Sequence, residues 1–207
     1  MGKRRMSWRA FVSPLLVVVV WELLAAAGVL RPNYVPAPSQ LGPHIVALLA
    51  GGELWRHLLV TMYRLGLSFV FALIPAVLLG LSLGMSRSAR LALEPILTSL
   101  YAIPKIALLP LVMLISGVNE RTLILTSTLT SFVQMTVSTM GGVMAVDRSI
   151  LEAGKNYGAT GWRLFRYVLF PSALPDIFTG MRIGLGLTLV LVIAVELTAA
   201  QEGLGAF

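Results

Sequence analysis

The segment from Leu65 to Ser86 contains no charged residue and is bracketed by Arg64 and Arg87. A helix needs about 20 mostly apolar residues to cross a bilayer core roughly 30 Å thick, and this segment is long enough. The chain as a whole is 57% hydrophobic and 12% charged, whereas soluble domains average about 25% charged residues. This composition excludes a single soluble globular domain, and the high hydrophobicity excludes a disordered chain. The sequence therefore predicts a membrane protein.

Further apolar segments are also long enough to cross a bilayer. We predict an all-α polytopic membrane protein with about five transmembrane helices, at residues 11–30, 65–86, 91–118, 122–146 and 177–200. Prolines and charged residues interrupt the third segment, so we expect it to begin at the interface and to cross from about Ile96. Residues 11–30 could instead be a signal peptide cleaved near Ala27, but Glu22 and the length of the segment favour a retained helix. Residues 39–49 are expected to form a short surface helix.

The net charge of +7 is explained by topology. With the amino terminus inside, most basic residues fall on inner segments, as the positive-inside rule requires. Residues 1–10 are then a cytoplasmic segment, residues 11–207 a single transmembrane domain, and residues 147–176 a cytoplasmic loop. This bias removes the need for a nucleic-acid partner. The inner set is Lys3, Arg4, Arg5, Arg9, Arg87, Arg90, Arg148, Lys155, Arg163 and Arg166, and the outer set is Arg31, Arg56, Arg64 and Arg121.

The loop at 147–176 is predicted to contain two short helices. Ser149 and Glu152 have the spacing of a capping box, which would start the first helix. Gly158 can take the left-handed conformation that ends a helix. Thr160 is placed to cap the second helix, which Pro171 would end. A loop with this much structure indicates a docking surface.

The spacing of this loop resembles the EAA loop of ABC importer permeases. The family pattern is Glu-Ala-Ala, three residues, Gly, nine residues and Ile-x-Leu-Pro. Here Glu152-Ala153-Gly154 is followed at the same spacings by Gly158 and by Val168-Leu169-Phe170-Pro171. Gly154 replaces the second alanine, and Val168 and Phe170 replace the isoleucine and leucine.

The resemblance extends along nearly the whole chain. The basic amino terminus, the proline-rich outer loop, residues 103–112 and the closing Glu202-Gly203-Leu204-Gly205 are similar to the nitrate/sulfonate/taurine/bicarbonate branch of these binding-protein-dependent inner membrane components. This resemblance implies a type I ABC importer-like topology in a bacterial-type plasma membrane. Members usually continue into one more helix, so a truncated, non-transporting scaffold is one alternative.

The resemblance also implies the partners. Two permease subunits, here a homodimer, would bind a cytoplasmic ABC ATPase dimer, and an extracytoplasmic binding protein would deliver a small anionic solute. ATP and Mg would be bound by the ATPase, so this chain would hold no cofactor and would not be an enzyme. Glu152 could instead merely cap its helix, and an ion-gradient transporter is the other alternative. The residues implied to couple to the ATPase are Glu152, Ala153, Gly154, Gly158, Val168, Phe170 and Pro171.

Polar residues within the apolar segments are candidates for a solute pathway, because such residues are costly in a membrane. The candidates are Lys105, Thr126, Thr130, Gln134 and Glu196. Two competing interpretations are ion pairs for the charged residues and interhelical hydrogen bonds for the hydroxyl-rich fourth segment.

Catalytic and metal-binding patterns are not found in the sequence. His44 and His57 are the only histidines, they lack metal-ligand spacing, and the chain contains no cysteine. There is also no phosphate-binding loop of the Gly-x-x-x-x-Gly-Lys-Ser/Thr type. Gly80 and Gly84 have the Gly-x-x-x-Gly spacing of close helix packing.

Overall fold

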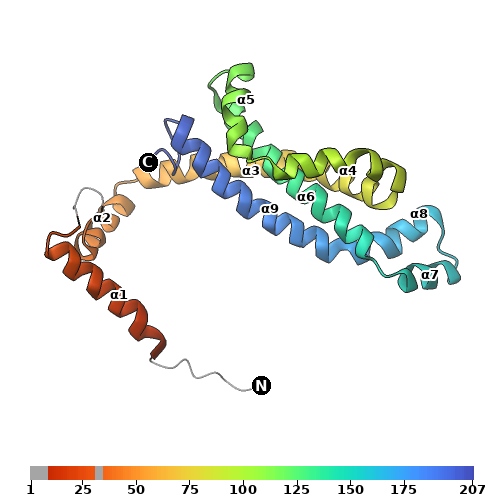
Figure 1. Ribbon diagram of the computed structural model, residues 1–207, viewed down its shortest axis with the longest axis horizontal. Coiled ribbons are helices and arrows are strands. Elements are labelled where there is room, and N and C mark those ends of the chain that lie inside the picture. The colour runs from red at the N-terminus through yellow and green to blue at the C-terminus, as the bar shows by residue number, and fades with distance from the viewer. Residues whose placement is uncertain (1–8, 31–34) are drawn as a thin grey trace. The chain divides into compact units, whose positions relative to one another are not determined.

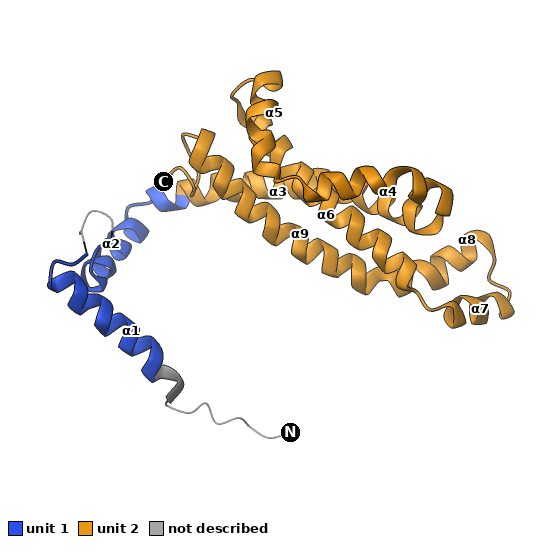
Figure 2. Cartoon of the chain, viewed as in Figure 1, with its two compact units in different colours: residues 1–55 blue, residues 56–207 orange. Residues whose placement is uncertain are grey.

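The computed structural model describes residues 9–30 and 35–207, and every regular element within them is helical (Figure 1). The chain divides into two compact units, residues 1–55 and 56–207 (Figure 2). The predicted basic cluster Lys3, Arg4 and Arg5, and the outer residue Arg31, lie outside the described residues. The elements are α1 (Arg9–Ala26), α2 (Pro38–Ala50), α3 (Glu53–Met85), α4 (Arg87–Ala102), η1 (Lys105–Leu108), α5 (Leu109–Ser116), α6 (Glu120–Ala145), α7 (Arg148–Asn156), α8 (Gly161–Leu164), η2 (Phe165–Leu169) and α9 (Phe170–Ala199).

Two helical segments are long and apolar enough to cross a membrane by themselves. They are α3 and the continuous 39-residue helix from Gly161 to Ala199. Two bent helix pairs, 87–116 and 120–156, raise the number of candidate spans among the described residues to as many as four. In α1, the described apolar stretch Val12–Ala26 is shorter. The prediction of an all-helical chain with several apolar spans is confirmed, and the number five stays a prediction.

The predicted third span is a broken helix. The axes of residues 87–102 and 105–116 differ by 92°. Ile103 and Pro104 between them have extended backbones, with ψ of 129° and 108°. A proline disfavours the helical conformation of the residue before it. The Ile103-Pro104 pair therefore ends α4, and η1 and α5 begin after it.

In the first unit, α1 and α2 are joined by hydrogen bonds to one carboxylate. Glu22 accepts from the backbone N–H of Ser39 at 3.0 Å and from its hydroxyl at 2.7 Å. The helix predicted at 39–49 is confirmed as α2, which begins one residue earlier, at Pro38. Proline suits this first position because the N–H that it lacks would have no partner in the helix.

The second unit packs α3 and α9 closely against α6. A Cβ built on Gly80 would lie 2.5 Å from Thr139 Cβ, and one on Gly84 would lie 2.5 Å from Val143 Cβ. On the α9 side, a Cβ on Gly184 would lie 3.0 Å from Met135 Cγ. The prediction of close packing at Gly80 and Gly84 is confirmed, because these glycines let the backbones approach.

Several side chains of the hydroxyl-rich helix α6 form hydrogen bonds within the helix itself. Thr126 and Thr136 donate to carbonyls four residues earlier, at 2.8 and 2.7 Å. Ser131 contacts the hydroxyl of Thr188 on α9, and Ser68 on α3 donates to an α6 carbonyl at 3.2 Å. The hydroxyl groups of α6 thus bond mainly within the helix, with a smaller share between helices.

Candidate functional sites

The helix α7 begins at Asp147. The carboxylate of Asp147 accepts a 2.9 Å hydrogen bond from the backbone N–H of Ser149. This bond holds the pKa of Asp147 below its usual value, because it favours the charged carboxylate. The predicted capping box of Ser149 and Glu152 is therefore wrong. Asp147, two residues before Ser149, is an equally good capping residue, and the helix begins at this earlier position.

The end of α7 agrees with the prediction for Gly158. Its φ is +82°, and its N–H donates to the carbonyl of Lys155 at 2.9 Å. The N–H of Ala159 donates to the carbonyl of Gly154 at 3.0 Å. These two bonds form a Schellman motif, which satisfies the last carbonyls of the helix. A residue with a Cβ at position 158 would be strained in this conformation.

Gly154 allows α7 to pack against the following helical segment. A Cβ at this position would lie 2.9 Å from Val168 Cγ2 and 3.2 Å from Leu164 Cδ1. The glycine that replaces the second alanine of the family pattern thus gives room for Val168. These contacts and the Schellman motif fix α7 relative to α8 and η2.

The prediction that Pro171 ends the second helix is wrong. The helix begins after Thr160, as predicted, although no cap bond from the Thr160 side chain forms, and it continues through Pro171 to Ala199. The turn before the proline is a π-helix, in which the N–H of Phe170 donates to the carbonyl of Phe165. Proline cannot donate to the carbonyl four residues earlier. The wider π turn accommodates this missing bond without ending the helix.

The loop exposes a carboxylate and three aromatic side chains. Glu152 and Ala153 are exposed, and among the described residues nothing hydrogen-bonds the Glu152 carboxylate. Tyr157 is 93% exposed, Trp162 70% and Tyr167 74%. The sequence predicted a docking surface in this loop but did not identify these three aromatic side chains as part of it. Tyrosine and tryptophan are enriched at the centres of protein interfaces.

A pocket of about 230 Å³ lies where α4 breaks into η1. It is lined by Tyr101, Lys105, Thr130, Gln134 and Leu187. Three of the predicted pathway residues, Lys105, Thr130 and Gln134, therefore line the same pocket. The Lys105 ammonium donates to the carbonyl of Tyr101 at 2.7 Å, and the buried hydroxyl oxygen of Thr130 has no partner among the described residues. A cation, a free hydroxyl and an amide can together bind a small anion.

Two predicted pathway residues lie elsewhere. Thr126 is buried, and its hydroxyl donates to the carbonyl of Thr122. Glu196 is 1% exposed and forms an ion pair with Arg64, with 2.8 Å between Oε1 and Nη1. The sequence left open whether Glu196 lines a pathway or forms an ion pair. The structure contains the ion pair with Arg64.

Arg64 is the centre of this buried network. Its Nε and Nη2 donate to both carboxylate oxygens of Glu120 on α6, at 2.6 and 2.9 Å. Glu196 also accepts from the Thr61 hydroxyl, at 3.0 and 2.9 Å. One guanidinium thus joins α3, α6 and α9 through two carboxylates.

The turn after α9 completes the network. The N–H of Gly205 donates to Glu196 at 3.1 Å, that of Leu204 to Thr61 at 2.8 Å, and that of Gly203 to His57 Nδ1 at 3.0 Å. This closing turn, residues 202–205, had been identified from the sequence by resemblance alone. Its function here is to satisfy buried acceptors on α3 and α9.

Known proteins match the chain over most of its length. A family model described as "Binding-protein-dependent transport system inner membrane component" matches residues 76–207. The taurine transport system permease protein TauC of Escherichia coli (strain K12) is 31% identical over 98% of this chain and 78% of its own length. The putative aliphatic sulfonates transport permease protein SsuC of the same strain is 33% identical over 93% of this chain and 73% of its own. The riboflavin transport system permease protein RibX of Chloroflexus aurantiacus is 33% identical over 98% of this chain and 77% of its own.

Proposed function

This chain belongs to the family of binding-protein-dependent transport system inner membrane components, and we propose that it forms the solute pathway of an ATP-driven importer and is driven through the loop at 147–176. It is a permease subunit of a binding-protein-dependent ABC transporter, a non-catalytic component of the inner membrane. The family favours ATP-driven transport over the ion-gradient alternative. Five spans with a cytoplasmic amino terminus are part of the proposal.

The geometry of the loop is the observation that carries the proposal. Transmission of force to membrane helices needs a rigid contact element, and α7 is fixed by its Asp147 cap, its Schellman motif and the packing of Gly154. The segment after it is continuous with the 39-residue helix that ends at Ala199. A movement of α7 would therefore be transmitted, through the packing of Gly154 against Leu164 and Val168, to a helix that continues into a span.

The exposed surface of the loop suits an ATPase partner. Tyr157, Trp162 and Tyr167 offer large, rigid side chains, and Glu152 offers a carboxylate that pairs with no cation among the residues that the structure describes. Ala153 lies beside Glu152 on α7, and a small residue there lets a partner approach closely. Val168, Phe170 and Pro171 act indirectly, because they set the packing and the π turn behind α7. ATP and Mg would be bound by the partner.

The pocket at the helix break supports an anionic solute. Non-helical backbone at membrane depth is tolerated where it is buried in protein or lines a cavity, and here the break at Ile103-Pro104 adjoins the pocket of Lys105, Thr130 and Gln134. Because two relatives are named for the transport of taurine and of aliphatic sulfonates, we propose a solute of the same class for this chain. A second copy of the chain, an ATPase dimer and an extracytoplasmic binding protein complete the proposed importer.

A glycine substitution in the loop tests the proposal. We expect Gly158→Val to reduce ATP-dependent taurine or alkanesulfonate uptake at least about tenfold, because a β-branched residue is strained at a φ of +82°. The chain should still insert into the membrane, while less of the ATPase copurifies with it. Gly186→Ala is the matched control, since a Cβ there meets nothing within 4 Å. Full uptake and normal ATPase recovery in Gly158→Val would contradict the coupling role.

A further inference from the structure

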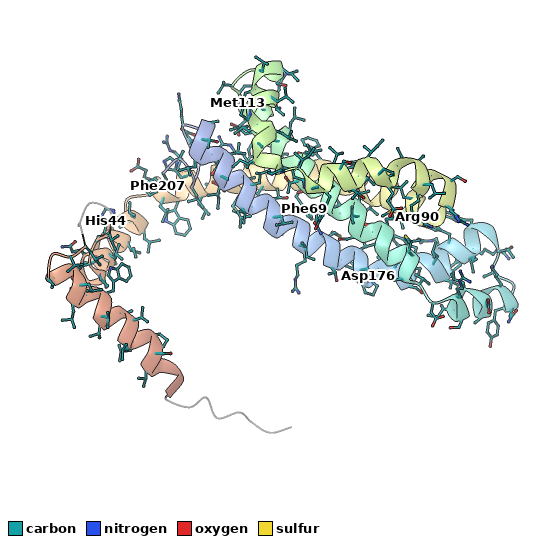
Figure 3. All side chains as sticks on the ribbon, in the orientation of Figure 1. His44, Phe69, Arg90, Met113, Asp176 and Phe207 are labelled. Carbon is teal, nitrogen blue, oxygen red and sulfur yellow. The ribbon has the colours of Figure 1, made fainter. Side chains whose placement is uncertain are left out.

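A second pocket lies between the transmembrane helices and the loop. It has a volume of about 580 Å³ and is lined by the ends of α3 and α6, by Arg90 of α4 and by residues of α7, α8 and η2. Arg90 lies at the end of α4 near α8 (Figure 3). The pocket is separate from the one at Lys105, which is lined by different residues.

The polar part of the pocket is basic. Arg90 and Arg148 both line it, and among the described residues neither has a carboxylate within salt-bridge distance. Arg90 Nη1 is held by the carbonyls of Leu83 and Gly84, at 3.4 Å each. The carboxylate nearest to Arg148 in the sequence, Asp147, is bonded to the N–H of Ser149. Two guanidinium groups thus remain available for an anion, and guanidinium binds phosphate in a bidentate manner.

The rest of the lining is mostly apolar. It includes Met85, Met144, Leu151 and Leu164. Met85 and Met144 are 54% and 51% exposed, and methionine adapts readily to flexible ligands. The apolar helices α3 and α6 end at Met85 and Ala145, so the basic groups lie where the apolar segments stop. A free anion would use the arginines and leave this apolar surface uncovered.

We propose that this pocket binds an anionic phospholipid, with the phosphate on Arg90 and Arg148 and an acyl chain against Met85, Met144 and Leu151. Basic pockets between membrane helices at the membrane surface are suited to anionic headgroups. The bound lipid fills the space between the bundle and α7. This site shares no lining residue with the pocket at Lys105, and none with the residues proposed to contact the ATPase.

Native mass spectrometry of the full chain in detergent tests the proposal. Dioleoyl-phosphatidylglycerol should remain bound, whereas dioleoyl-phosphatidylcholine at the same concentration should not. In Arg90→Gln/Arg148→Gln, the apparent affinity for phosphatidylglycerol should fall roughly twenty-five-fold, on the order of fivefold for each basic side chain. The matched control is Arg163→Gln/Arg166→Gln, which removes the same amount of charge from loop positions outside the pocket, and it should bind as the unchanged protein does.

A single variant distinguishes loss of lipid binding from misfolding. Because Arg90 also contacts the α3 carbonyls, the double variant could unfold, whereas Arg148 is exposed. Arg148→Gln alone should therefore weaken phosphatidylglycerol binding about fivefold with an unchanged melting temperature.

Three results would overturn the proposal. The first is undiminished phosphatidylglycerol binding by Arg148→Gln and by the double variant. The second is equal affinity for dihexanoyl- and dioleoyl-phosphatidylglycerol, or complete displacement by inorganic phosphate, since either would show a site for the anion alone. The third is release of the lipid when the ATPase partner is added, which would assign the pocket to that protein.

Discussion

Replacement of Glu196 by alanine should destabilise the folded chain measurably, because it breaks the buried network centred on Arg64. The Glu196 side chain is fully buried, and its carboxylate accepts from Arg64 at 2.8 Å, from Thr61 at 2.9 Å and from the N–H of Gly205 at 3.1 Å. Removal of one partner of a buried ion pair costs about 3–5 kcal/mol. We expect the lower end of this range, because Arg64 keeps its two bonds to Glu120.

The assay is thermal unfolding of the purified chain in detergent. For a chain of this size, about 3 kcal/mol corresponds to a melting temperature lower by roughly 6–12 °C. Glu120→Ala should have a smaller effect, about 1 kcal/mol, because the Glu120 side chain is 45% exposed. Arg64→Met/Glu196→Met should recover most of the loss of Glu196→Ala, since apolar replacement of both partners leaves no buried charge unpaired.

Two results would refute this reasoning. One is a melting temperature of Glu196→Ala that equals that of the unchanged protein. The other is a loss in Arg64→Met/Glu196→Met that equals the sum of the losses in Arg64→Met and in Glu196→Met, because that would show that Arg64 and Glu196 contribute independently.

Three further predictions concern other parts of the molecule. Gly80→Ala should destabilise the chain by about 1–3 kcal/mol in the same melting assay, because its Cβ would lie 2.8 Å from the backbone oxygen of Thr136, whereas Gly66→Ala, with open space around it, should not. Lys105→Met should lower uptake of an anionic solute about tenfold while the ATPase still copurifies, because it removes the cation of the 230 Å³ pocket; unchanged uptake would place the pathway elsewhere. The pKa of Asp147 is lowered by its bond to Ser149, so the cap stabilises α7 above the ordinary pKa of aspartate, about 3.9, and this stabilisation is lost as pH falls through the lowered value. The protection factors of the amides of residues 149–151, which correct for the intrinsic pH dependence of hydrogen exchange, should therefore fall in acid, and Asp147→Asn, whose amide oxygen caps without titrating, should remove this fall.

Much of the fold could be predicted from the sequence because it depends on local composition. The uncharged stretch at 65–86 lies within α3, and the left-handed glycine at 158 ends α7 as its conformational freedom predicts. The Gly80 and Gly84 contacts also followed from local spacing. In each case one residue type has a physical property that few others share.

The errors arose where residues compete or where distant segments meet. Ser149 and Asp147 are both good caps, and the local pattern does not rank them. Pro171 stops an ordinary α-helix, but a π turn accommodates it. The bonds of Glu196 to Arg64 and to the turn at 202–205 depend on tertiary packing. Likewise, exposure of Tyr157 and Trp162 depends on which face of the loop packs inward.

Photo-crosslinking from the loop tests the central claim most directly. The chain contains no cysteine, so Tyr157→Cys provides a single thiol at a 93% exposed position that can be labelled with benzophenone maleimide. In membranes that contain the assembled importer, the account predicts a crosslinked product of this chain with the ATPase. Val118→Cys, at a 69% exposed position outside the loop, should give none. An ATPase product from position 118 and none from position 157 would contradict the account.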